Sequence, residues 1–143
     1  MPVTSKTQAK NEMLSVYKAV ADAQGIVVSI YPNSTTSKPE AESVDAWAIV
    51  QINDTSKPRA SIGSANGSKR YRTEGFLMIE LFTNYGEGTT ESETISDAIE
   101  SAYRGGATDG GINFKDPVTV EGRNDTNWYK VTILIQYYYD TIQ

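Results

Sequence analysis

The pattern of apolar and polar residues from Tyr71 to Thr83 predicts the longest strand of the chain. Beyond Phe76 this segment is apolar on both faces, and Glu80 is the exception. A strand with two apolar faces is covered on both of them. We therefore expect the fold to cover one face and another surface to cover the second.

The next periodic segment predicts an amphipathic helix. A turn at Asn84–Gly88 precedes it, and Thr90 with Glu93 fits a capping box at its start. Gly105–Gly106 supplies a stop. Apolar residues recur on one helical stripe: Ile95, Ala98, Ile99, Ala102 and Tyr103.

The N-terminal third predicts a helix and two strands. A helical stripe runs through Ser5–Gln24 and ends at Gly25, a typical C-terminal cap. Ile26–Tyr31 is β-branched and aromatic, as strands are. A Ser/Thr-rich loop, 33–43, separates it from a second strand, Asp45–Ile52.

The C-terminal third predicts a hairpin. Ile112–Phe114 and Pro117–Val120 read as short strands, and 122–127 reads as a turn. The closing strand is Trp128–Tyr139, with Trp128, Leu134 and Tyr138 on its second face. Its first face carries Tyr129, Val131, Ile133, Ile135, Tyr137 and Tyr139.

This order of elements predicts an α+β fold, with a mostly antiparallel sheet and two helices packed on one face. The length of 143 residues suits a single domain covering 1–143. Neither a repeat nor a linker divides it.

Composition excludes several function classes. The chain has no cysteine and no histidine, which removes thiolate chemistry, the commonest general base and the commonest metal ligands. The net charge of −5 gives no whole-chain basic character for binding nucleic acid. No apolar run approaches the roughly 20 residues of a membrane span. The N-terminus lacks an apolar signal core, so we expect the chain to be made and kept in a cytoplasm unless another protein carries it out. We expect no cofactor, no metal and no enzymatic activity.

The segment 53–70 is a long basic arm. It is rich in Ser, Gly and Asn, and long loops between paired strands are uncommon unless they are functional or disordered. Two interpretations stay open: a solvated mobile hairpin, or an arm that becomes ordered on contact. Phosphate contact by its lysines and arginines is disfavoured by the acidity of the whole chain.

Charges of opposite sign are segregated along the sequence. The arm and the start of the long strand are basic, whereas the second helix is acidic, and such patches suit head-to-tail association of copies, although ordinary surface charge would look the same. Glu80 interrupts an apolar strand, which suits an interface or a channel lining, or else a solvated carboxylate. The predicted interface residues are Lys57, Arg59, Lys69, Arg70, Arg72, Glu80, Glu91, Glu93, Asp97 and Glu100.

Candidate catalytic arrangements are weak. Glu74 and Glu80 lie six residues apart on one strand, roughly 20 Å, too far for a carboxylate pair. The run 105–111 is rich in glycine but follows a helix and lacks Gly-Lys-Ser/Thr, so it does not suit phosphate binding.

The framework from Arg70 to Thr83, the turn Gly86–Thr89 and the acidic helix ending Ala102–Gly105 resemble the tail terminator, or tail completion, proteins of long-tailed bacteriophages. Trp128–Val131 and the stretch 58–63 continue the resemblance, which spans most of the chain. It is a pattern of framework residues and contains no catalytic signature.

The resemblance implies a small α+β subunit that assembles as a ring, usually a hexamer, on the head-proximal end of the tail tube. Such a ring stops tube polymerisation and joins the tail to the head. The implied partners are further copies of the chain, the tail tube protein and a head-completion or neck protein, with genome DNA passing through the channel without specific binding and with no membrane. The alternatives are another head–tail connector or stopper, or a small ligand-binding module.

Overall fold

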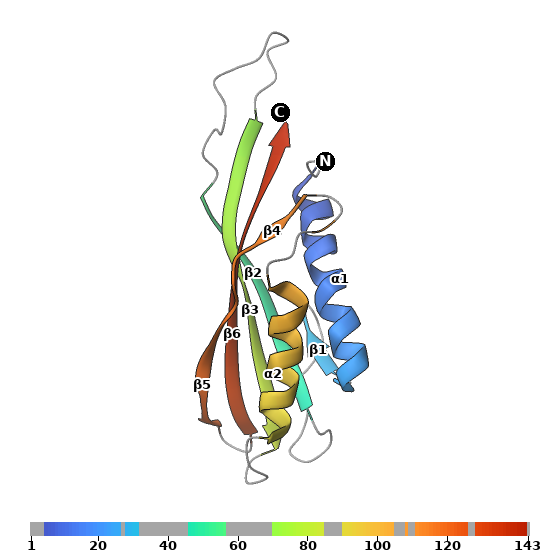
Figure 1. Cartoon of the computed structure of the whole chain (residues 1–143), viewed down its shortest axis with the longest axis vertical. Coiled ribbons are helices and arrows are strands. Elements are labelled where there is room, and N and C mark those ends of the chain that lie inside the picture. The colour runs from blue at the N-terminus through green and yellow to red at the C-terminus, as the bar shows by residue number, and fades with distance from the viewer. Residues whose placement is uncertain are drawn as a thin grey trace.

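The computed structural model describes residues 5–26, 28–31, 46–56, 70–84, 90–104, 108, 111–125 and 128–142. In this part of the chain one sheet is covered by two helices, so the predicted α+β class is confirmed (Figure 1). The elements are α1 (Lys6–Gln24), β1 (Val28–Ile30), β2 (Ala46–Ser56), β3 (Arg70–Asn84), α2 (Thr90–Tyr103), β4 (Asn113–Phe114), β5 (Val118–Asp125) and β6 (Trp128–Ile142).

The antiparallel pair β3–β6 is the spine of the sheet. The two strands stay in register along their whole length, from Arg70 opposite Ile142 to Asn84 opposite Trp128. β2 pairs antiparallel with the other side of β3, and β1 pairs parallel with β2. β4 and β5 both pair antiparallel with β6, at different heights. The predicted mostly antiparallel sheet is confirmed.

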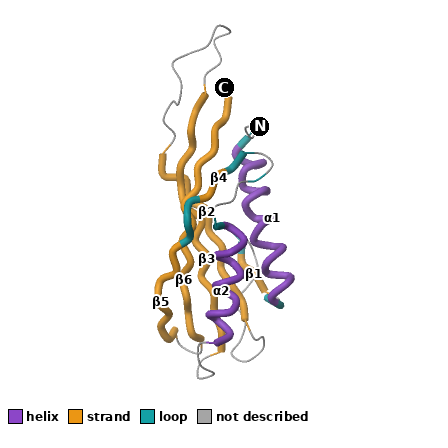
Figure 2. The backbone as a smooth tube through the Cα atoms, viewed as in Figure 1, coloured by secondary structure: helices purple, strands orange, loops and turns teal. Residues whose placement is uncertain are grey.

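Both helices pack on the same face of this sheet, as predicted (Figure 2). Buried apolar side chains of α1 and α2 form one core with alternate residues of β2, β3 and β6. Two tyrosine hydroxyls connect α1 to its neighbours. Tyr103 donates to the carbonyl oxygen of Met13 at 2.8 Å, which joins α2 to α1, and Tyr17 shares a hydrogen bond with Ser29 at 2.7 Å.

The first helix forms as its sequence predicts. The Ser5 side chain accepts a hydrogen bond from the backbone N–H of Gln8, which satisfies one of the free donors of the first turn. The helix ends at Gly25, whose φ of 78° lies in the left-handed region that other residues avoid.

The opposite face of the sheet, here called the helix-free face, holds an aromatic cluster where β2 and β6 begin and β3 ends. Trp47 stacks on Phe82, with ring centroids 4.1 Å apart, and Trp128 meets Trp47 edge-on at 5.8 Å. All three side chains are buried. The predicted second face of the closing strand, with Trp128 on it, is therefore confirmed.

Several predicted boundaries were wrong. The predicted turn at 122–127 is strand as far as Asp125, because a bulge after Val120 lets β5 continue beside β6. The arm is shorter than 53–70, because its first four residues extend β2 and Arg70 begins β3. The predicted strand Ile26–Tyr31 is limited to Val28–Ile30.

The second helix also differs in detail from its prediction. Thr90 is already its first helical residue and so does not precede the helix as a cap. Ala102 is exposed, and Ser92 and Ser96 take part in the buried stripe. The predicted turn at 84–88, apart from Asn84, the loop at 33–43 and the stop at 105–106 lie outside the described residues.

Gly75 is required where three strands meet. Asp54, Gly75 and Tyr137 lie side by side on β2, β3 and β6. The Tyr137 ring crosses over Gly75, and its hydroxyl donates a hydrogen bond to the Asp54 carboxylate. A Cβ on Gly75 would lie 2.2 Å from the Asn53 carbonyl oxygen and 2.6 Å from the Tyr137 hydroxyl. No side chain fits there without movement of the backbone.

We therefore expect Gly75→Ala to lower the free energy of unfolding by about 1–3 kcal/mol, the range for overpacking in a well-packed site. Denaturant unfolding of the variant measures this change. The matched control is Gln51→Ala, an exposed change on the neighbouring strand, which should stay within about 0.5 kcal/mol of the unchanged protein. Equal stability of Gly75→Ala and the control would contradict the placement of the Tyr137 ring over Gly75.

Tyr17 gives the fold a pH dependence. Burial raises the pKa of Tyr17 to about 12, above its ordinary value of 10.0. Between these two values the unfolded chain releases the proton and the folded chain keeps it. Stability is therefore fully present below pH 10 and falls as pH rises toward 12, by up to about 1.4 kcal/mol per pH unit for this group.

Unfolding of the protein and of Tyr17→Phe at pH 9, 10 and 11 checks this prediction. The variant should lose less stability than the parent between pH 10 and pH 11. Parallel curves for the two proteins would show that Tyr17 does not ionise with a raised pKa.

Candidate functional site

The helix-free face carries charges that are already paired within the chain. The Arg72 guanidinium lies on Asp140 through two contacts, Nε to Oδ1 at 2.9 Å and Nη2 to Oδ2 at 3.3 Å. It also lies over the Tyr138 ring, 4.7 Å from the centroid. The hydrogen bond with Asp140 raises the pKa of Arg72, so this residue stays cationic. The predicted interface residue Arg72 thus has a partner on its own neighbouring strand.

Glu80 lies on the same face, eight residues further along β3. Its carboxylate is 3.9 Å from the Lys130 ammonium on β6, and its side chain is 21% exposed. The register places Glu80 next to Thr132 and Ile49, so it lies in the middle of the sheet instead of at an edge. Glu80 therefore does not face an edge of the sheet, and its place at an interface or in a channel lining stays a prediction.

Apolar side chains occupy the face between these two ion pairs. Phe76 and Met78 of β3 and Leu134 of β6 are half-buried, and Met78 lies opposite Leu134. Val118 of β5 continues this row and is 59% exposed. The prediction that a second surface covers this face of the long strand stays a prediction, but the apolar residues that would need covering are there.

The acidic residues of α2 do not join this face. Glu91, Glu93 and Asp97 are exposed, and Glu100 is half-buried, on a helix that packs against the opposite face of the sheet. Glu93, Asp97 and Glu100 share one flank of the helix by their spacing of four and three residues. Glu91 and Glu93 also lie in the first turn, where a carboxylate favours the helix dipole.

The remaining predicted interface residues are basic. Lys57, Arg59 and Lys69 lie outside the described residues. Arg70 begins β3, and the structure describes its backbone position only. The structure therefore brings Arg72 and Glu80 onto one face of one strand, and it keeps the α2 carboxylates apart from them.

Sequence reasoning missed a polar junction between α1 and the sheet. Lys6 Nζ lies 3.0 Å from Asp54 Oδ2, while Tyr137 donates to Asp54 Oδ1. The hydrogen bond with Asp54 raises the pKa of Lys6, and burial together with the Asp54 contact raises the pKa of Tyr137. Asp54 was visible as the lone acid of a basic stretch, but its partners are 48 and 83 residues away in the sequence.

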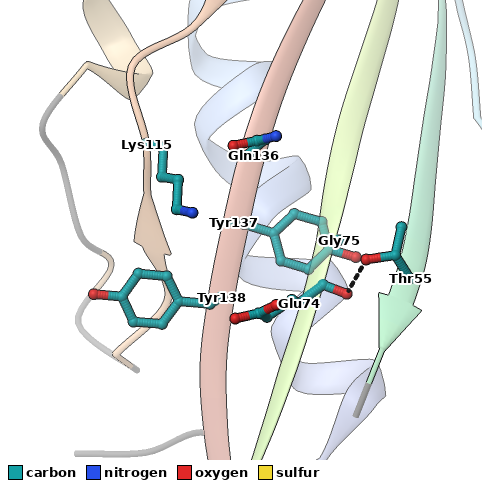
Figure 3. A pocket seen from close by; sticks show the side chains of 7 residues that line it. All are labelled: Thr55, Glu74, Gly75, Lys115, Gln136, Tyr137 and Tyr138. Atoms are coloured by element: carbon teal, nitrogen blue, oxygen red, sulfur yellow. Dashed lines mark hydrogen bonds between the residues drawn. The ribbon is translucent and has the colours of Figure 1, made fainter. Parts of the chain in front are cut away.

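A small polar pocket opens beside this junction, where β4 gives way to β5 along β6 (Figure 3). Its volume is about 100 Å³, below the roughly 300–1,000 Å³ of typical small-molecule sites. Figure 3 shows the Lys115 ammonium directed into it, and the Thr55 hydroxyl donating to the Glu74 carbonyl oxygen at 3.2 Å. The pocket is lined by Thr55, Glu74, Gly75, Lys115, Gln136, Tyr137 and Tyr138.

Within the described residues no three acidic, histidine or cysteine side chains are grouped so as to hold a metal ion. None of the helices in that part of the chain is long and apolar enough to span a membrane.

Comparison with known proteins supports the fold alone. No protein-family profile matches the chain, and no curated protein does. One matching solved structure, of a protein whose name states no activity, superposes with a TM-score of 0.69 at 13% identity. The match covers 94% of this chain and 95% of the other. The architecture is therefore shared over nearly the full length, and the low identity carries no function across.

We expect Tyr137→Phe to lower the free energy of unfolding by about 1.5–3 kcal/mol, because it removes a hydrogen bond to a charged, half-buried carboxylate. Denaturant unfolding measures the change, with Tyr71→Phe as a control that removes a tyrosine hydroxyl elsewhere on the sheet. Lys6→Met added to Tyr137→Phe should change stability by less than the sum of the two single changes, since both act on Asp54. Additive losses would contradict a shared junction.

Proposed function

We propose that this protein is a structural virion protein that forms a ring on the head-proximal end of a bacteriophage tail tube. The ring ends tube polymerisation and provides the surface to which the head joins. The chain acts without catalysis, metal or cofactor. It is assembled in the bacterial host cytoplasm and remains in the tail of the virion.

The partners in this proposal are five further copies of the chain, the tail tube protein and a head-completion protein. Genome DNA passes through the channel of the ring without specific binding. The chain's net charge of −5 suits that role, since like charge keeps a polyanion moving instead of holding it.

The observation that carries the proposal is the placement of the residues that resemble tail terminators. The stretch 70–83 lies in β3, one of the two strands of the spine. The stretch 90–104 contains α2, which packs on β3, and the residue that follows α2. The resemblance thus concerns the part of the chain on which the rest of the fold is built.

The helix-free face gives a second line of support. Its ionic side chains already have partners on neighbouring strands, Arg72 with Asp140 and Glu80 with Lys130. Covering these two pairs leaves neither the Arg72 charge nor the Glu80 charge buried without a partner, which is the main cost of burying ions. Its apolar residues between the pairs suit contact with another subunit.

The positions of opposite charge give a third line of support. The basic segment 57–69 joins the end of β2 to the start of β3, whereas α2 begins just after β3 ends (Figure 1). These two places are separated by the length of β3, 15 residues or roughly 50 Å. The described residues that flank the basic segment, Ser56 and Arg70, therefore lie at the opposite end of β3 from the start of the acidic helix. Segregated charge of this kind suits contact between copies.

We expect Asp97→Lys to weaken assembly without unfolding the chain. Asp97 is exposed in the middle of α2, away from the helix ends, so reversal of its charge acts chiefly on what approaches the helix. The matched control is Asp22→Lys, the same change at an exposed position of α1. Light scattering coupled to size exclusion measures the mass of each variant over a range of concentrations.

Assembly of Asp97→Lys at the same concentration as the unchanged protein would contradict a role for the acidic helix. Binding to tail-tube ends in the absence of heads separates a terminator from a head-side stopper. A protein that binds isolated heads and leaves tube ends bare would be a stopper.

A further inference from the structure

One margin of the sheet exposes apolar side chains. Val118 and Val120 of β5 are 59% and 48% exposed, and they are the exposed large apolar side chains of the described residues. Among the described strands β5 pairs with β6 alone, so its outer backbone groups face away from the sheet (Figure 1). An uncovered edge with apolar residues is a template for another strand.

The opposite margin is β1. Among the described strands it pairs with β2 alone. Val28 and Ile30 lie beside Trp47 and Ile49 and pack against the aromatic cluster of the helix-free face. Both margins therefore carry apolar residues on the same face of the sheet.

The two margins run in opposite directions. β1 is parallel to β2, while β2–β3, β3–β6 and β6–β5 are each antiparallel. Following these pairings across the sheet, β5 runs antiparallel to β1. When two copies stand side by side the same way up, the β5 edge of one meets the β1 edge of the next as an antiparallel pair, the more stable kind of ladder.

The margins also match in height. A single row of directly opposed residues crosses five of the six strands, from β1 to β5, and both of its ends are apolar. The row is Ile30, Ile49, Glu80, Thr132 and Val120. Val120 of one copy therefore stands level with Ile30 of the next when the copies are not displaced along the strands.

The helices of neighbouring copies flank the same junction. α2 packs on β3 and β6, and α1 lies toward β1 through the bond between Tyr17 and Ser29. When β5 of one copy lies beside β1 of the next, the helix after the acidic α2 of the first copy is therefore α1 of the second. Lys18 of α1 is exposed and lines an open hollow of about 360 Å³ with Tyr31, the residue after β1.

We infer that the outer edge of β5 pairs with the outer edge of β1 in a second copy of this chain, with Val120 beside Ile30. The contact is heterologous, so it repeats from copy to copy and closes when the rotation between copies divides a full turn. This inference rests on the ring of the proposed function and assigns the surfaces that build it. The sheet then continues from one subunit to the next.

Cysteine pairs test the contact cleanly, because the chain contains no cysteine. In the variant Ile30→Cys/Val120→Cys, the two thiols of one copy are four strand spacings apart, roughly 19 Å. A disulfide needs Cα atoms within about 7 Å, so it can form only between copies. The control Ile30→Cys/Ala102→Cys places the second thiol on the exposed surface of α2, on the other face of the sheet.

Mild oxidation of the Ile30→Cys/Val120→Cys variant should give a ladder of covalent multimers on a non-reducing gel, ending at one closed size. The control and each single variant should give none. Val118→Lys/Val120→Lys should shift the mass measured by light scattering from the ring to the monomer with the circular dichroism unchanged, whereas Val118→Thr/Val120→Thr should keep the ring.

Rings that form without a ladder, and that survive the lysine variant, would overturn the edge contact and leave the proposed function standing. A covalent dimer of Val120→Cys alone would overturn it too, since β5 would then pair with β5. A protein that stays monomeric at every concentration, gives no ladder and does not bind tube ends would overturn both proposals.

Discussion

The row in which Tyr137 crosses Gly75 to reach Asp54 is the constraint on which the fold depends. It holds β6, β3 and β2 in one register, and Lys6 attaches the first helix to the same carboxylate. Only glycine leaves room for the ring, because a Cβ would meet the Asn53 carbonyl oxygen. Below this row the strands carry the helices and the core. Above it, β3 and β6 extend past the helical layer (Figure 1).

Placing both helices on one face has a direct consequence for function. The core is completed on that side, and the other face keeps half-buried apolar residues between two ion pairs. The charges of these two pairs lie along neighbouring strands. Such a face, with two apolar sheet margins, suits a subunit that is completed by its neighbours. That is the basis for proposing a ring.

Much of the fold could be predicted from the sequence, because the signals were local. The helix over 5–24, the Gly25 stop and the period-two pattern of the last strand each reflect neighbouring residues, and each is confirmed. The bulge in β5 could not be predicted, because it is a shift in the pairing register with β6 and leaves no local signal in the sequence. Arg72 and Glu80 were chosen for their charge, but their partners come from β6, some fifty or more residues later. Asp54 was passed over for the same reason.

The central claim is that this chain caps a tail tube. The most direct measurement is electron microscopy of purified cognate tail tubes, without heads, after incubation with the protein. We expect a ring of density at one end of each tube, and we expect the capped tubes not to lengthen when tube protein is added. Tubes with two bare ends that continue to grow in the presence of folded protein would contradict it.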